Sequence, residues 1–191
     1  SGTVENFDIP RLAEMDNVCM TEEGHEYFSP FAMLWMNNRE GPTADKRFRQ
    51  AVMYAMDREF AKNVLWNGLG NVPLSAFGSN ARFQNDDLEP YDYNPDRARE
   101  LLDEMGYDGE EITILGDWDY DLAFTYLYQY GDPALGISRT YLSDNIAKGS
   151  PWNNVEGYEN ERVDELFNEA ATAYPDEERE KLYREVQEIL H

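Results

Sequence analysis

The sequence has few of the side chains on which metal centres and covalent catalysis usually depend. Cys19 is the single cysteine among 191 residues, so the chain cannot form a disulfide within itself. There are two histidines, His25 near one end and His191 at the last position. This set is too small for the usual nitrogen and sulfur ligands of zinc, and it argues against a Ser-His-Asp or Cys-His catalytic group. We therefore expect no metal and no cofactor.

Basic residues are also scarce. Lysine and arginine number 16, only four of them lysine, against 39 aspartates and glutamates, and the formal net charge is -23. A field of this sign repels nucleic acid and anionic lipid, so we expect neither as a partner. A solvated acidic surface explains the charge most simply, and adaptation of the host to high salt is the sharper alternative.

Long apolar runs are absent as well. No segment approaches the roughly 20 apolar residues of a transmembrane helix. The start at Ser1 lacks the basic segment and apolar core of a signal peptide. What the chain does have is 41% hydrophobic and 14% aromatic residues, which predicts one folded domain rather than a disordered chain.

The spacing of apolar residues predicts both helices and strands. The apolar run 26–38 is typical of a buried strand that ends at Asn37. A helix is predicted over 45–66, capped by Thr43, with Asp57 and Arg58 near its middle. Further patterns predict a helix between Asn94 and Gly106 and strands over 112–115 and 120–126. Three more helices are predicted: a short one near 138–147, one begun by Asn160 and a last one begun by Pro175. This order favours an α/β fold class.

Two regions are expected to complete the core. The long loop 67–94 either carries function or wraps over the core, because loops of this length are uncommon inside compact domains. The apolar stripes of three helices should be buried. They consist of Phe48, Val52, Ala55, Leu101, Leu102, Leu166 and Phe167.

Two carboxylate patterns do not meet the requirements of the sites they suggest. Asp117, Asp119 and Asp121 alternate like calcium ligands, but Leu122 and Tyr128 stand where a calcium loop needs glycine and glutamate. The many acids also allow a glycosidase-like pair, yet no two are set apart by apolar surroundings. No Walker loop or Gly-x-Gly-x-x-Gly run is present. We therefore expect no metal site and no enzyme, and a carboxylate-based glycosidase fragment is the least favoured alternative.

Four segments together resemble a known family: Arg49–Phe60, Tyr91–Leu102, Asp119–Phe124 and Gly157–Leu166. Their order and spacing are similar to those in the large ligand-binding lobe of the family 5 extracellular solute-binding proteins. These are the capture subunits of ABC importers for peptides, nickel and oligosaccharides. The resemblance implies a single α/β lobe of a type II periplasmic-binding-protein-like fold, truncated, over residues 1–191. In that scheme 1–25 is the segment that crosses between lobes, and 26–191 is the ligand-binding lobe.

The resemblance also implies a function and a location. The protein would capture a small-molecule solute, either a peptide or an oligosaccharide, and deliver it to the permease subunits of an ABC transporter. It would be a monomer in the periplasmic or extracellular space, anchored to the membrane in the full-length protein as a lipoprotein. The competing class is a non-catalytic acidic interaction or structural module.

Ligand contacts follow from one run of the resemblance. Many members continue the strand with Gly-Trp-x-x-Asp-Tyr-x-Asp-Pro, and here the corresponding run is 125–133. Tyr126 stands at the tryptophan, which forms an aromatic wall, and Tyr130 and Asp132 keep the register. Gln129 stands where peptide-binding members carry the aspartate that pairs with the α-ammonium of the peptide. Because Gln129 supplies no counter-charge, the resemblance favours neutral, hydroxyl-rich ligands over peptides with a free amino terminus.

Two further side chains are candidates for the ligand cleft. Asn37 closes the earlier strand, as an asparagine does in the family. Trp152 lies in irregular chain, where binding groups are common.

The chain departs from the family pattern in its length. The family places a helix and a strand between elements like 112–115 and 119–124, whereas here 115–118 joins them directly. We therefore expect an internal deletion near 115–118. The chain also stops at His191, before the family returns to the other lobe.

Overall fold

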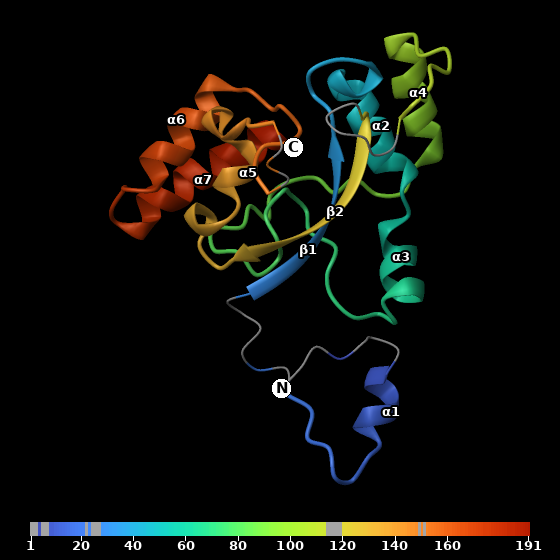
Figure 1. The fold of residues 1–191 in the computed structure, drawn as a ribbon, viewed down its shortest axis with the longest axis vertical. Coiled ribbons are helices and arrows are strands. Elements are labelled where there is room, and N and C mark those ends of the chain that lie inside the picture. The colour runs from blue at the N-terminus through green and yellow to red at the C-terminus, as the bar shows by residue number, and fades with distance from the viewer. Residues whose placement is uncertain are drawn as a thin grey trace.

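A two-stranded antiparallel sheet lies at the centre of the fold (Figure 1). The computed structural model describes residues 4, 8–21, 23, 28–113, 120–148, 150 and 152–191. Strand β1 (Phe28–Met36) pairs with β2 (Leu122–Tyr130), so that Phe28 is opposite Tyr130 at one end and Met36 is opposite Leu122 at the other. The strand predicted over 26–38 is thereby confirmed. The strand predicted over 120–126 begins two residues later and continues four residues further.

The segment before β2 differs from the prediction. Residues 112 and 113 form no strand, and 114–119, which include Asp117 and Asp119, lie outside the described residues. The Thr113 carbonyl accepts backbone hydrogen bonds from Asp121 and Leu122, and the Thr113 N–H donates to Asp121 Oδ2 at 2.7 Å. These bonds fasten the incoming chain to the start of β2.

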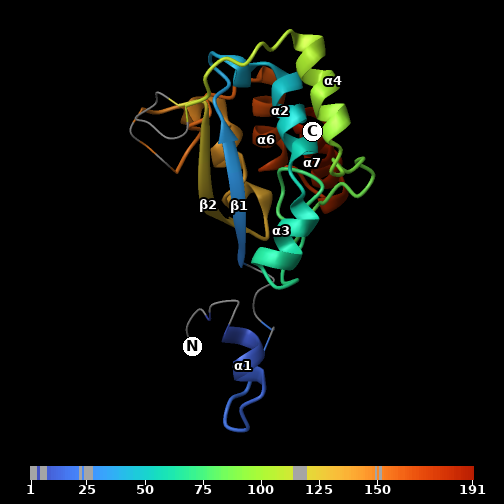
Figure 2. The same ribbon diagram turned by 90° about the vertical axis from the view of Figure 1, so that its right-hand side faces the viewer.

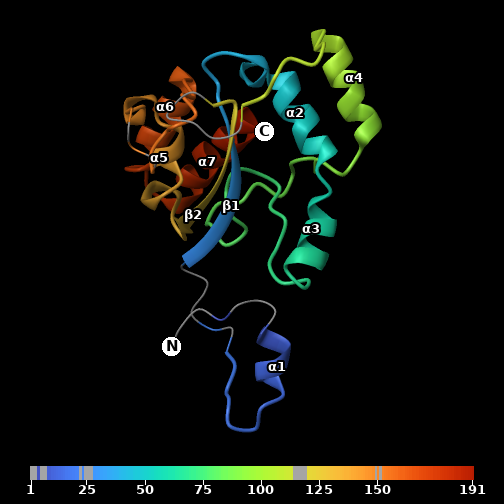
Figure 3. The same ribbon diagram turned by 45° about the vertical axis from the view of Figure 1, so that its right-hand side comes forward.

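Two groups of helices lie on either side of the sheet (Figures 1 and 3). One group consists of α2 (Lys46–Ala55), α3 (Arg58–Leu65) and α4 (Pro95–Met105). The other consists of α5 (Ser138–Tyr141), α6 (Glu161–Ala170) and α7 (Asp176–Leu190). Short 3-10 turns are η2 (Pro42–Ala44), η3 (Pro133–Leu135) and η4 (Ser143–Asn145). Helix α1 (Ile9–Ala13) lies apart from the rest in every view, and the whole is the predicted mixed α/β arrangement.

The helix predicted over 45–66 is two helices, so this prediction was wrong at its middle. Met56 and Asp57 leave the helical conformation, with ψ of 117° and 84°. Asp57 then caps α3, because its Oδ1 accepts the Phe60 N–H at 2.8 Å. Asp45 rather than Thr43 caps α2, by accepting the Arg47 N–H at 2.8 Å. A carboxylate that can reach a free N–H competes with continued helix, which explains the break.

The short helix predicted near 138–147 is confirmed only over 138–141, because Leu142 leaves the helical conformation with ψ of 129° and 143–145 form a separate 3-10 turn. The predicted helix ends at Asn94, Gly106, Asn160 and Pro175 are confirmed. Asn94 Oδ1 accepts the Arg97 N–H at 3.0 Å and starts α4, while Gly106 ends it with a φ of 76°. This left-handed conformation costs glycine nothing. Asn160 caps α6, and Pro175 precedes the first turn of α7.

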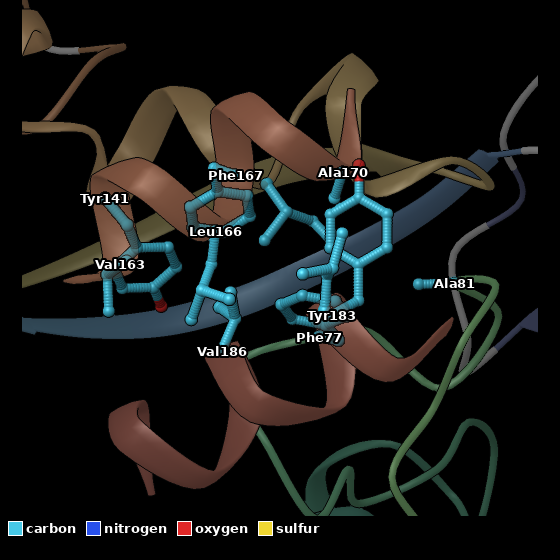
Figure 4. Close-up of a cluster of buried hydrophobic side chains, with 11 residues drawn as sticks. Phe77, Ala81, Tyr141, Val163, Leu166, Phe167, Ala170, Tyr183 and Val186 are labelled. Atoms are coloured by element: carbon cyan, nitrogen blue, oxygen red, sulfur yellow. The ribbon is translucent and has the colours of Figure 1, made fainter. Parts of the chain in front are cut away.

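The largest core cluster lies between α6, α7 and the long loop (Figure 4). Phe77, from the loop, is fully buried and packs against Phe167 and Tyr183, with ring centroids 6.4 and 6.1 Å away. The loop therefore wraps over the core, one of its two predicted roles. Of the residues expected to be buried, Phe48, Leu101, Leu166 and Phe167 are buried, Val52 and Leu102 are half-buried, and Ala55 is exposed. Ala55 is exposed where α2 ends.

None of the helices in the part of the chain that the structure describes is both long enough and apolar enough to cross a membrane.

Candidate functional site

The predicted ligand residues lie at different places along the sheet. Asn37 follows the end of β1 at which Met36 pairs with Leu122, whereas Gln129 and Tyr130 lie at the other end of β2. Eight strand steps separate the two ends, which is roughly 26 Å. Tyr126 lies between them, opposite Ala32. Asn37 therefore lies far from Gln129 and Tyr130 along the sheet, and which of the six residues contact a solute stays a prediction.

Gln129 serves the fold rather than an open surface. Its side chain is 3% exposed. Its Oε1 accepts the Gly78 N–H, and its Nε2 donates to the Ala76 carbonyl at 3.0 Å. Both ends of the amide therefore hold the buried loop around Phe77 against β2, and Gln129 does not present its amide to a ligand.

Asp132 is also engaged within the protein. Its Oδ1 accepts the Ala134 N–H at 3.0 Å, and both carboxylate oxygens lie 2.8 Å from Nη2 of Arg179. Arg179 comes from α7 and also donates to the Ala170 carbonyl at 3.0 Å. The Asp132 carboxylate thus joins the end of β2 to α7. Tyr130, two residues earlier, is half-buried beside Gly136.

Asn37 lies in the turn at the other end of the sheet, and Trp152 lies in irregular chain. Asn37 is 4% exposed, and its Oδ1 accepts the Arg39 N–H at 3.1 Å. The next residue, Asn38, donates its N–H to the Glu156 carbonyl at 2.8 Å, which ties this turn to the loop that follows Trp152. Trp152 itself is 59% exposed. Trp152 is thus a predicted ligand residue whose aromatic side chain faces solvent.

A cavity of 320 Å³ lies elsewhere, between β1, α2, the segment 73–76 and the end of α7. Much of its wall is apolar. The apolar side chains include Met33, Met53, Met56, Leu74, Ile189 and Leu190.

Four polar residues meet at one part of the cavity wall: Arg49, Glu156, Tyr141 and Tyr158. Burial raises the pKa of Glu156 to about 8, against the opposing influence of the Arg49 guanidinium. Burial likewise raises the pKa of Tyr141 and lowers that of Arg49. Arg49 is held in place by the carbonyls of Thr43 and Ala44, at 2.9 and 2.8 Å from its Nη1. Glu156 is therefore largely protonated at neutral pH and can donate as well as accept a hydrogen bond.

A second polar group lines the cavity near the end of the chain. The Tyr91 hydroxyl donates to the His191 carbonyl at 2.6 Å and accepts from Gln50 Nε2 at 3.0 Å. Arg58 Nη2 donates to the Tyr91 carbonyl at 2.8 Å. Burial lowers the pKa of His191, which favours its neutral form. These bonds join α2, the long loop and the end of α7 into one wall.

No local pattern in the sequence points to this cavity. Arg49 and Glu156 are 107 positions apart in the sequence, and both resemble ordinary surface charges. Within the described residues no group of three or more histidine, cysteine, aspartate or glutamate side chains could hold a metal ion. An apolar enclosure with a few convergent polar groups has the general character of a ligand-binding pocket.

Comparison with known proteins identifies the family. The family described as bacterial extracellular solute-binding proteins, family 5 middle, matches residues 9–173. The chain belongs to this family. This confirms the resemblance seen in the sequence. The family consists of solute-binding proteins, in agreement with the expectation of a non-enzymatic role.

Similarity in sequence and in fold to individual proteins extends over most of this chain. Heme-binding protein A of Haemophilus influenzae is 26% identical over 206 residues, covering 84% of this chain and 37% of that protein. The periplasmic binding protein DppA of Helicobacter pylori, solved with a peptide, superposes with a TM-score of 0.80 at 19% identity over 98% of this chain and 44% of that one. NikZ of Campylobacter jejuni, solved with Ni(L-His), gives a TM-score of 0.75 at 17% identity over 98% of this chain and 47% of that one. The chain thus has the fold of one portion of a periplasmic binding protein and spans less than half the length of these relatives.

Proposed function

We propose that this chain is the large ligand-binding lobe of the solute-binding component of an ABC importer. The observation that carries the proposal is the family match over residues 9–173. The superposition on DppA, which is described as ABC transporter-associated, supports the same role. In such a protein a solute is captured reversibly between two lobes, and closure of the lobes removes it from water.

We propose a peptide as the solute. The dipeptide-binding protein of Escherichia coli is 30% identical over 73 residues, 38% of this chain, and DppA was solved with a peptide. The sequence argument for a neutral, hydroxyl-rich ligand depended on Gln129 as a ligand group. Because both ends of the Gln129 amide bind the 76–78 backbone, that argument loses its basis. Haem is the second candidate, since the relative that matches 84% of this chain is a haem-binding protein.

The contacts of the solute are part of this proposal. Trp152 is exposed and can stack on a ligand, and Tyr126 and Tyr130 are the further aromatic candidates on β2. Asn37, Gln129 and Asp132 contribute by fixing the backbone at the two ends of the sheet. We further propose that the whole protein, meaning this chain with the remaining length of its relatives, works in the periplasmic or extracellular space. It would be anchored to the membrane and deliver its solute to permease subunits.

A panel of solutes tests the proposal. Thermal unfolding of the whole protein would be followed with di- to pentapeptides, haem, Ni(L-His) and oligosaccharides, each at about 1 mM where solubility allows. Peptides should raise the unfolding temperature, because a ligand that binds only the folded state stabilises it. A rise with haem alone would replace the peptide by the second candidate. No rise with any of the four classes would contradict the proposed function.

A further inference from the structure

The cavity of 320 Å³ carries a charge opposite to that of the chain. Its lining includes three cations, Lys46, Arg49 and Arg58, which come from α2 and from the first residue of α3. Among the described residues that line the cavity, Glu156 is the one acidic side chain, and burial keeps its carboxyl largely protonated at neutral pH by raising its pKa. The lining is therefore positive in a chain whose formal net charge is -23. A local field of this sign favours an anion at this place.

Hydrogen-bond donors meet at one part of the cavity wall. Arg49 uses its Nη1 for the carbonyls of Thr43 and Ala44, which holds the guanidinium in place. Within the described residues no hydrogen bond is found for the Tyr141 hydroxyl or for the Glu156 carboxyl, and both residues line the cavity. A phenol and a protonated carboxyl can each donate one hydrogen bond. A ligand that brings an acceptor to this place would therefore satisfy donors that the protein leaves free.

The rest of the cavity is suited to an alkyl chain. α2 lies beside β1 (Figure 2), and the space between them is lined by Met33 and Met53, with Leu74 of the long loop and Leu190 of α7. Methionine side chains are unbranched and adapt to the shape of an apolar ligand. At about 30 Å³ for each heavy atom, the share of a molecule in liquid water, the cavity holds about ten heavy atoms. This is the size of a carboxylate with eight carbons.

The cavity is separate from the predicted contacts of the solute. Of the predicted ligand residues whose side chains the structure describes, none lines it. Gln129 and Asp132 bind other parts of the protein, and Trp152 faces solvent. The cavity lies within this lobe, whereas the proposed solute is captured between two lobes.

We propose that the cavity is a binding site for a small apolar carboxylate, additional to the space between the two lobes. The carboxylate group would accept hydrogen bonds from Arg49, Tyr141 and Glu156, and the alkyl chain would lie against Met53 and Leu74. A carboxylate can be buried where a cation and hydrogen-bond donors compensate for the lost water. The site does not depend on the nature of the solute.

Three probes with eight carbons and different charge test the sign of the site. Octanoate, octanol and octylammonium would be titrated into the whole protein at pH 7 and followed by calorimetry. Octanoate should bind at least tenfold more tightly than the other two, because it alone brings an anion to Arg49. The net charge of -23 favours the cation everywhere else, so equal or tighter binding of octylammonium would overturn the proposal. Equal binding of octanol, or no binding of octanoate at roughly 5 mM, would overturn it as well.

A substitution that fills the cavity tests the location. Leu74→Trp adds volume inside the cavity, and Leu69→Trp makes the same change at an exposed position of the same loop that does not line it. Leu74→Trp should weaken octanoate at least tenfold, because the added ring takes the place of the alkyl chain, whereas Leu69→Trp should leave the affinity within about twofold. Equal affinities of the two variants would place octanoate elsewhere and overturn the proposal.

A second pair of variants tests the cation. Arg49→Gln removes the charge but keeps an amide that can donate to the carbonyls of Thr43 and Ala44, and Arg99→Gln removes the same charge from an exposed position of α4. Arg49→Gln should weaken octanoate at least tenfold and leave octanol unchanged, and Arg99→Gln should change neither. Unchanged octanoate binding in Arg49→Gln would overturn the proposal. If Arg49→Gln does not fold, as judged by its thermal unfolding, the three probes and Leu74→Trp decide.

Competition with a peptide separates this site from the proposed function. A tetrapeptide at saturation should leave the affinity of octanoate unchanged, because the two occupy different places. Displacement of octanoate by the peptide would make the cavity part of the solute site, which would overturn a separate site and leave the proposed function intact. Binding of octanoate in a whole protein that binds no peptide, haem, nickel complex or oligosaccharide would support this site while contradicting the proposed function.

Discussion

At the scale of single residues, two polar side chains join separate elements of this fold. Gln129 joins β2 to the loop that buries Phe77, and Asp132 joins the end of β2 to Arg179 of α7. Both are residues at which the resemblance suggested a ligand contact. Because their polar atoms are hydrogen-bonded inside the protein, their removal should be seen first in stability.

Substitution of Gln129 tests this interpretation. Gln129→Met keeps the size of the side chain but leaves the Ala76 carbonyl and the Gly78 N–H without their partner. We expect the free energy of unfolding to fall by about 1–3 kcal/mol, measured by urea denaturation. Phe124→Leu, at an exposed position of the same strand, should change it by less than about 0.5 kcal/mol. Unchanged stability of Gln129→Met would return Gln129 to the list of ligand residues.

Glu156 makes the stability of this chain dependent on pH. The pKa of its carboxyl is raised by burial from 4.5 to about 8, so between these values the folded chain keeps a proton that the unfolded chain has lost. The free energy of unfolding should therefore fall as pH rises from about 4.5 to about 8, and this contribution should be constant above that. The ionisable groups that interact with the carboxyl include Arg49, Tyr120, Tyr141 and Tyr158.

Glu156→Gln should remove this dependence. Relative to the unsubstituted chain, the variant should be more stable by about 2–4 kcal/mol at pH 8 and by much less at pH 4.5. Urea denaturation at several pH values measures the difference, and Glu159→Gln at an exposed position provides the control. A difference that does not grow with pH would contradict the raised pKa.

At the scale of elements, predictions of helix ends that depend on a few neighbouring residues are confirmed. Asn94 and Gly106 mark the two ends of α4 because capping depends on bonds within one turn. The break at Met56 and Asp57 was missed because the apolar spacing continues across it, and only the carboxylate of Asp57 shows where a new helix begins. The strand predicted over 112–115 is not formed at residues 112 and 113, because strand formation depends on a partner elsewhere in the chain.

The cap at Asp57 gives a prediction for α3. This helix has no buried residue and exposes Phe60, Val64 and Leu65, so little packing supports it. Asp57→Ala should therefore lower the stability of α3 by about 0.5–2 kcal/mol, seen as faster hydrogen exchange of its amides. Asp57→Asn keeps a capping oxygen and should lose only a small part of this. Equal exchange in all three proteins would show that the cap does not hold α3.

At the scale of the whole molecule, the family was predictable from the sequence and the site was not. The order of four segments indicated the family, and the profile match over residues 9–173 confirmed it. The cavity depends on Arg49, Glu156 and the end of α7 meeting in space, which no local pattern records. Five of the six predicted ligand residues were chosen by correspondence in sequence and Trp152 for its place in irregular chain, and the register of β1 and β2 places Tyr126, Gln129 and Tyr130 at successive positions of β2.

In the proposed function this chain is one lobe of a protein that binds a peptide between two lobes. Titration calorimetry of one tetrapeptide into the whole protein and into the 191-residue chain tests it most directly. The whole protein should bind with a dissociation constant in the micromolar range or tighter. The lobe alone should bind no better than about millimolar, or roughly -4 kcal/mol, because the other lobe supplies much of the enclosing surface. No binding of tetrapeptides to the whole protein, or equally tight binding to the isolated lobe, would contradict the account.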